Sequence, residues 1–418
     1  MNPSTGSVPP DAHGSGAGGA APFHQPSRRW AVLALLSTAL LLGMSEWFTA
    51  TAVAPQLQER WSLTAQQVAA LTVLVQWGFV AGTAVAAVLN LADVVPSRVF
   101  FSLSALGAAG VNAALLASPG FSEGAVLRFL TGLFLAGVYP PAMKMISTWF
   151  RSARGLAIGT VVGALTVGKA APYLLKALGG TSLEAVVLGT SAAGVVASFL
   201  VLVLYRDGPH AFPSRPFAWS RVGELVRHKP TMLATGGYLG HMWELYAMWT
   251  LVPAYFMVAL GGRGLEGSWL SADLLGFATI AAGGAGAVLA GRWADILGRE
   301  RITIWAMAVS GGCALTVGWL VAAPLALLLP LTLVWGFSVV ADSAQFSAVV
   351  TEVAPAHAVG TALTLQTALG FALTGFSIDL ASRVVDSSGW GAGFSLLAIG
   401  PALGILSMVT LRRRRRSA

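Results

Sequence analysis

The sequence predicts an all-α membrane protein with twelve transmembrane helices. Only 10% of its 418 residues are charged, whereas 56% are hydrophobic, and soluble domains carry about 25% charged residues. The apolar residues recur in blocks of about 20, the length that a helix needs to cross a ~30 Å hydrocarbon core. Because these blocks are continuously apolar rather than alternating, a membrane barrel built of strands is excluded.

Twelve apolar blocks define the expected crossings. We expect the first block to remain as a helix rather than act as a cleavable signal, because it follows a long tail and exceeds the usual signal length. The blocks are residues 30–53, 67–89, 99–118, 124–146, 155–177, 183–204, 231–259, 271–290, 302–322, 325–348, 359–380 and 392–411.

The distribution of basic residues orients the chain. With both termini placed in the cytoplasm, 19 of the 25 Lys and Arg residues fall on the cytoplasmic side, and only Arg60, Lys176, Arg263 and Arg383 fall outside. This asymmetry follows the positive-inside rule for an even number of crossings. The net charge of +8 therefore indicates orientation in a lipid bilayer and not a nucleic-acid partner.

The composition divides the chain into five parts. A Gly-, Pro- and Ser-rich start predicts a disordered tail, and a polar, proline-containing segment between the sixth and seventh blocks predicts a linker. The expected parts are a tail at 1–27, a six-helix bundle at 28–205, a cytoplasmic linker at 206–229, a second six-helix bundle at 230–411 and a basic cytoplasmic tail at 412–418.

An internal repeat supports this division into two pseudo-symmetric bundles. The loop after the eighth block reads Gly291-Arg-Trp-Ala-Asp-Ile-Leu-Gly-Arg-Glu-Arg301, and the loop after the second reads Leu89-Asn-Leu-Ala-Asp-Val-Val-Pro-Ser-Arg98. The two aspartates, Asp295 and Asp93, are 202 positions apart (295 minus 93). That spacing is close to half the chain, as expected for a duplicated unit.

The eighth-block loop resembles the loop motif of the major facilitator superfamily, Gly-x-x-Ala-Asp-x-x-Gly-Arg-x-Arg. The resemblance implies two six-helix bundles and transport by alternating access. It also implies that the motif aspartate caps a neighbouring helix and holds the cytoplasmic side closed, together with basic residues. The first copy matches clearly only at its aspartate and last arginine. The residues implied in this cytoplasmic gate are Asp93, Arg98, Gly291, Asp295, Gly298, Arg299 and Arg301.

Two further stretches resemble the same superfamily. The segment from Arg128 to Pro141 is similar to its fourth-helix motif, with a buried arginine and spaced small residues. The segment from Gly237 to Trp249 resembles a bacterial subgroup near the nitrate, nitrite and cyanate permeases. Nitrate carriers place an arginine in helices two and eight, and this chain has none in 67–89 or 271–290. Nitrate is therefore not the expected substrate.

Ionisable residues deep in the blocks are candidates for substrate binding or proton coupling, because a charge at mid-bilayer costs at least ~2.5 kcal/mol. By resemblance, helices one, four, seven and ten line a central cavity. The candidates are Glu46, Arg128, Lys169, His241, Glu244 and Asp342, with Trp243 as an aromatic contact.

His241 and Glu244 are three residues apart, so we expect them to share one helix face and a proton or hydrogen bond. For Glu46 an alternative is a structural ion pair with Lys169 or Arg128. The two basic residues in turn either bind an anionic substrate or neutralise the buried acids.

The expected function is proton-coupled transport of a small organic solute, which is an anion if Lys169 or Arg128 faces the cavity, with efflux of a drug-like compound as the alternative. A membrane-embedded enzyme or receptor is a distant third, since there is no His-rich metal cluster and no nucleophile elbow. No metal or cofactor is expected. We expect a monomer, and the arginine-rich composition favours a bacterial cytoplasmic membrane.

Overall fold

The computed structural model describes residues 26–178, 182–210, 217–264 and 270–417, and every regular element in these ranges is helical. The predicted all-α class is therefore confirmed. The helices are α1 Pro26–Gly43, α2 Thr49–Ala52, α3 Ala54–Trp61, α4 Ala65–Val88, α5 Leu91–Val94, α6 Ser97–Ala114, α7 Phe121–Leu135, α8 Tyr139–Ser147, α9 Arg154–Ala177, α10 Leu183–Leu204, α11 Val222–Arg227, α12 Lys229–Gly261, α13 Ala272–Leu297, α14 Arg299–Val317, α15 Leu325–Ala341, α16 Ser343–Val353, α17 Val359–Leu397 and α18 Ile399–Ser417.

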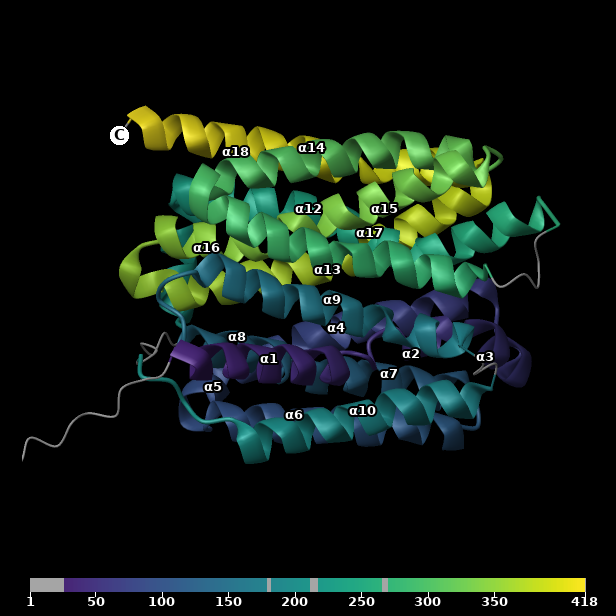
Figure 1. Cartoon of the computed structure of the whole chain (residues 1–418), viewed down its shortest axis with the longest axis horizontal. Helices are drawn as coiled ribbons and strands as arrows, with labels where there is room; N and C mark the ends of the chain where they lie inside the picture. Colours follow the sequence, from purple (N-terminus) through teal and green to yellow (C-terminus); the bar gives the residue numbers. More distant parts are fainter. Residues whose placement is uncertain (1–25, 179–181, 211–216, 265–269, 418) are drawn as a thin grey trace, which may run out of the picture.

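The helices run roughly parallel in two halves, with α1 to α10 on one side and α12 to α18 on the other (Figure 1). Within the described residues, ten helical segments are long and apolar enough to cross a membrane. One of these, Ala356–Arg416, contains two predicted crossings, because the backbone at Gly389 leaves the helical region with φ 83°. The predicted first crossing, residues 30–53, is interrupted and consists of α1 and α2.

Three predicted crossings are broken rather than continuous. The first breaks after Gly43, the fourth between α7 and α8, and the tenth at Asp342. The fourth break has a local cause, because Pro140 and Pro141 stand in the first turn of α8 and cannot donate backbone hydrogen bonds to the preceding turn. The first break is held by a distant side chain, as described below. Broken helices in a membrane are tolerated where the freed backbone groups find partners inside the protein.

The two halves meet mainly along α9 and α13. Glycines allow this close approach: a Cβ at Gly159 would lie 2.4 Å from the carbonyl oxygen of Ala287, and one at Gly163 would lie 2.6 Å from that of Gly284. No larger residue fits at these positions without moving the helices apart. A second contact joins α4 to α17, where the rings of Phe79 and Phe371 lie 4.2 Å apart.

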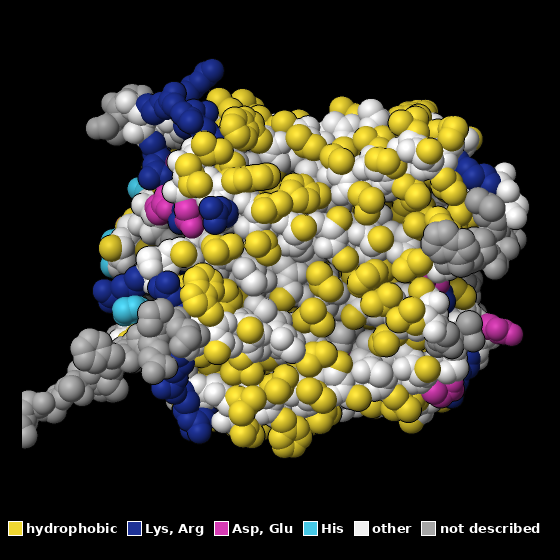
Figure 2. Space-filling view, viewed as in Figure 1, with side chains coloured by type: hydrophobic (Ala, Val, Ile, Leu, Met, Phe, Trp, Pro, Cys, Tyr) yellow, Lys and Arg dark blue, Asp and Glu magenta, His cyan; other side chains and the backbone are white. Residues whose placement is uncertain are grey.

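Charged side chains gather at the two ends of the molecule, and the face in between is largely apolar (Figure 2). Most of the basic side chains in this view lie at the end that carries the C-terminus. This distribution matches the surface of a protein embedded in a bilayer, with polar ends in the headgroup regions.

Candidate functional site

A cavity of about 60 Å³ lies between the two halves. It is small beside the roughly 300–1,000 Å³ of typical ligand pockets, so the halves leave little room at this level. Met44, Phe79, Tyr139, Val162, Leu165, Thr166 and Lys169 line it from one half, and Tyr238, His241, Met242, Leu245, Tyr246, Trp249, Ser343, Ser347, Thr367 and Phe371 from the other.

Lys169 of α9 presents a buried ammonium group to this cavity. Its Nζ lies 3.7 Å from the ring centre of Trp47, and it contacts the hydroxyl of Tyr246. The rings of Tyr246, Trp249 and Phe371 lie within 4.5 to 5.8 Å of Nζ. Across the described residues, Lys169 makes no ion pair with a carboxylate. Nζ is therefore surrounded by aromatic faces, which attract cations electrostatically.

His241 of α12 lies on the opposite wall of the cavity. Its Nδ1 is 2.9 Å from Asp342 Oδ1, and its Nε2 is 2.9 Å from Ser343 Oγ. Asp342 and Ser343 form the junction between α15 and α16, where the tenth crossing breaks. The buried imidazole thus connects α12 to the break. Among the described residues that line the cavity, His241 is the one whose side chain is paired with a carboxylate.

The expected pairing of His241 with Glu244 is wrong. Glu244 Oε1 accepts a hydrogen bond of 2.7 Å from Trp335 Nε1, and Oε2 accepts one of 2.8 Å from Ser310 Oγ. These donors come from α15 and α14, so Glu244 is directed into the second half and does not line the cavity. Residues three apart on a helix are offset by about 60° around its axis, and here the two side chains have different neighbours.

Trp243 also turns away from the cavity. Its Nε1 donates a hydrogen bond of 3.1 Å to the carbonyl oxygen of Leu396, and its ring lies 6.0 Å from that of Phe376. Trp243, the predicted aromatic contact, therefore does not line the cavity, whereas Tyr246 and Trp249 of the same helix do.

Arg128 of α7 holds the break in the first crossing. Its Nη2 donates to the carbonyl oxygens of Glu46 and Trp47 at 3.1 and 2.6 Å, and its Nη1 donates to Asn112 Oδ1 at 3.1 Å. Carbonyls freed by the break thus find partners within the first half. Arg128 does not line the cavity and is not available there for a substrate.

The carboxylate of Glu46 points into the first half. A Cβ at Gly194 of α10 would lie 2.1 Å from its Oε1, and neither carboxylate oxygen accepts a hydrogen bond. It forms neither of the two proposed structural ion pairs. Lys169 instead occupies its aromatic surroundings, and Arg128 donates to main-chain oxygens.

Asp295 of α13 reaches across to the other half. A Cβ at Gly155, in the first turn of α9, would lie 2.4 Å from Asp295 Oδ1, and one at Gly291 would lie 2.4 Å from the Gly155 carbonyl oxygen. The carboxylate therefore lies at the N-terminus of α9, where the helix dipole favours negative charge. This is the geometry that the loop motif implied for its aspartate.

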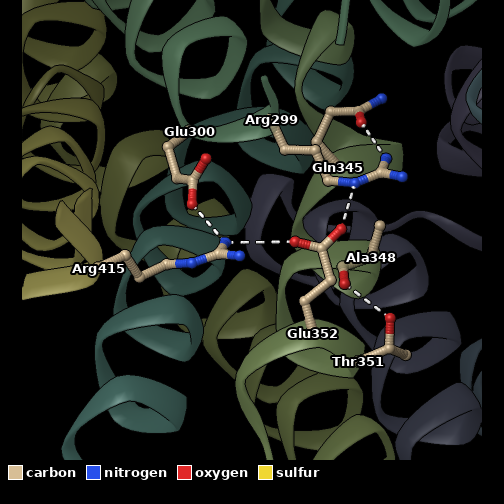
Figure 3. A network of polar contacts seen from close by, with 7 residues as sticks. All are labelled: Arg299, Glu300, Gln345, Ala348, Thr351, Glu352 and Arg415. Atoms are coloured by element: carbon tan, nitrogen blue, oxygen red, sulfur yellow. Dashed lines mark hydrogen bonds and ion pairs between the residues drawn. The ribbon is translucent and has the colours of Figure 1, made fainter. Parts of the chain in front are cut away.

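The remaining gate candidates lie at the same end of the molecule. Arg299 donates to Glu352 Oε1 at 2.7 Å and to Gln345 Oε1 at 2.9 Å, and Figure 3 shows Arg415 between Glu300 and Glu352. Gly298 adopts φ 90° between α13 and α14. Arg301 and Arg98 are exposed, and the side chain of Asp93 lies outside the described part of the structure.

Sequence reasoning missed several residues that complete these sites. Phe371 and Thr367 are uncharged residues of an apolar helix, and no sequence signal distinguishes them from packing residues. Glu352 and Arg415 are charged residues near helix ends. The sequence places Glu352 in a loop and Arg415 in the basic tail, and nothing in it indicates that they pair. Lys176 and Asp273 form an ion pair of 3.2 Å between α9 and α13 at the end opposite Asp295.

The family model of the Major Facilitator Superfamily matches residues 35–378. That range covers α2 to α16 completely, together with the second half of α1 and the first half of α17. No curated protein matches the chain. Because the family match spans well over half of the residues, the chain belongs to the Major Facilitator Superfamily and is a multi-pass secondary transporter of that family.

Proposed function

We propose that the protein transports a small organic anion by alternating access, coupled to protons. The observation that carries this proposal is the placement of Lys169 and His241 on opposite walls of one cavity between the halves. A cation that binds substrate and a titratable group that binds protons are the two elements that coupled anion transport needs.

The surroundings of Lys169 support an anionic substrate. A buried charge is costly in a membrane, and a cation–π contact recovers only about 2 kcal/mol when desolvated. A carboxylate that reached Lys169 from the cavity would offer a full opposite charge in a site with few competing waters. The hydroxyls of Ser343 and Thr367 on the facing wall supply donors for the remaining oxygens of such a ligand.

The contacts of His241 support proton coupling. Protonated imidazole adds a full positive charge to its contact with the Asp342 carboxylate 2.9 Å away, whereas neutral imidazole contributes only a hydrogen bond. Because Asp342 lies at the break between α15 and α16, a change of charge on His241 alters an interaction that holds two parts of this crossing. We therefore assign proton coupling to His241 and Asp342. Glu46 and Glu244 do not line the cavity, and we assign them no part in coupling.

Alternating access is supported by contacts at both ends of the interface between α9 and α13. Asp295 lies against Gly155 at one end, and Lys176 pairs with Asp273 at the other. Opening of either side requires one of these contacts to part. The basic end would face the cytoplasm of a bacterial cell, with both termini there, and the protein would act as a monomer without catalytic activity.

Efflux of an amphipathic cation is the second candidate. Aromatic rings from Trp47, Tyr246, Trp249 and Phe371 surround the Lys169 ammonium. Such a cage also binds quaternary ammonium ligands. In this case Lys169 would occupy the cage in the absence of substrate and leave when the cation enters.

Thermal stability of the purified protein separates the two candidates. Small carboxylates and lipophilic cations are titrated at pH 5.5 and 7.5, because a ligand that binds the folded state raises its stability. We expect carboxylates to stabilise the wild type and Lys229→Met, an exposed control, but not Lys169→Met. Stabilisation by lipophilic cations alone, retained or increased in Lys169→Met, would instead establish the efflux function.

A further inference from the structure

A large apolar groove lies on the outer side of the second half, between α13, α14 and α15. Its volume is about 540 Å³, several times that of the central cavity. Alanines form much of its floor and aromatic rings part of its wall, among them Ala282, Ala285, Ala306, Trp293, Trp305 and Phe337. Trp293 and Trp305 are 43% and 55% exposed, so the groove opens to the surroundings of the protein and not to its core.

The groove covers the depth of one membrane leaflet. Its lining on α13 extends from Ala282 to Trp293, which is eleven steps along the helix (293 minus 282). At 1.5 Å per residue this is about 16 Å, close to half of a ~30 Å hydrocarbon core. It ends where α13 and α14 meet, at the end of the molecule that carries the ion network of Arg299. A hollow of this depth in a bilayer is filled by hydrocarbon, since an empty one would forfeit dispersion contacts along its whole wall.

Basic side chains stand at this end of the groove. Arg292 precedes the lining residue Trp293, and Arg301 precedes the lining residue Ile302, and both arginines are exposed. Neither makes an ion pair within the described ranges, whereas the neighbouring Arg299 and Arg415 are paired with Glu352 and Glu300. Two unneutralised guanidinium groups at headgroup level are complementary to a lipid phosphate.

We infer that this groove binds one anionic phospholipid of the leaflet at the basic end. An acyl chain lies along the alanine floor between α13 and α15, and the phosphate is held by Arg292 and Arg301. The site is separate from the central cavity and does not depend on the substrate proposed above. Because Arg299 and Glu300 lie between the two arginines in sequence, a bound lipid would adjoin the contacts that hold the cytoplasmic gate.

Native mass spectrometry of the full chain tests the headgroup contact. Dioleoyl phosphatidylglycerol and dioleoyl phosphatidylcholine carry the same tails, so they differ only at the headgroup. One arginine beside an anionic lipid is worth about a fivefold change in affinity, so we expect one tightly bound phosphatidylglycerol, preferred by about tenfold or more. Arg292→Gln and Arg301→Gln should each lower its affinity about fivefold, and the matched surface variant Arg227→Gln should leave it unchanged.

Filling the groove tests the acyl-chain contact. Ala306→Phe places a ring in the groove and should abolish phosphatidylglycerol binding, whereas Leu406→Phe on the exposed face of α18 should not. Equal binding of the two lipids, unchanged binding in both arginine variants, or full binding in Ala306→Phe would each overturn the inference. So would a dimer that forms through this face and displaces the lipid.

Discussion

Lys176 Nζ lies 3.2 Å from Asp273 Oδ2 and joins α9 to α13 at the end opposite the contact between Asp295 and Gly155. The two side chains are 16% and 22% exposed, so water screens the pair only in part. The same two helices therefore contact each other through polar side chains near both ends, through Lys176 and Asp273 at one end and through Asp295 at the other. This arrangement makes the two contacts separable by mutation.

Removal of the ion pair between Lys176 and Asp273 should shift the protein toward the state that is open at that end of the molecule. Ion pairs of this exposure contribute up to about 1 kcal/mol, so Asp273→Asn should raise the open population about fivefold. Accessibility of a cysteine placed in the cavity to a membrane-impermeant thiol reagent measures this population. The exchanged pair, Lys176→Asp with Asp273→Lys, should restore it, and equal accessibility in all three proteins would disprove a gating role.

The contact between Asp295 and the start of α9 should be lost when a methyl group is added at Gly155. The added Cβ would lie 2.4 Å from Asp295 Oδ1 and 2.5 Å from the Gly291 carbonyl oxygen, so α9 and α13 cannot approach as closely. We expect Gly155→Ala and Asp295→Asn to slow transport at least tenfold while leaving the protein folded. Gly110→Ala is the control, because nothing lies within 4 Å of its added Cβ. Transport at the wild-type rate in Asp295→Asn would contradict the gating role of the carboxylate.

The ion network of Arg299, Glu352 and Arg415 should stabilise the second half modestly. Glu352 accepts from Arg299 and Arg415, at 2.7 and 3.2 Å, and Arg415 donates to Glu300 and Glu352, so Glu352→Gln and Arg415→Gln should lower stability by similar amounts. Partly exposed pairs contribute about 0.2–1 kcal/mol each. Thermal unfolding of the single and double variants gives the coupling energy, with the exposed Glu59→Gln as control. A double variant whose loss equals the sum of the single losses would show that the two residues act independently.

Substitution of His241 and of Glu244 should separate proton coupling from structure. His241→Gln removes the imidazole that contacts Asp342, so transport should no longer respond to an imposed pH gradient. Glu244→Gln replaces an oxygen that accepts from Trp335 or Ser310, so it should cost about 1–3 kcal/mol of stability and leave the pH dependence intact. If Glu244→Gln abolished the pH dependence and His241→Gln retained it, Glu244 would be the residue that couples transport to protons.

The sequence predicted the crossings and the deep ionisable residues, because both follow from composition along a single helix. It also predicted the contact of Asp295 with a neighbouring helix, through the loop motif. It could not predict the break after Gly43, which depends on hydrogen bonds from Arg128 at a distance of more than 80 residues. Nor could it separate His241 from Glu244, because the donors to Glu244 come from α14 and α15. Side-chain direction is decided by such tertiary neighbours rather than by spacing.

Uptake into proteoliposomes under an imposed pH gradient tests the central claim most directly. The carboxylate that stabilises the purified protein is supplied outside, at pH 5.5 outside and 7.5 inside, with Lys229→Met as the matched control for Lys169→Met. The account predicts accumulation in the wild type and in Lys229→Met that collapses with a protonophore, and no accumulation in Lys169→Met. Accumulation in Lys169→Met at the wild-type rate, or uptake in the wild type that ignores the gradient, would contradict it.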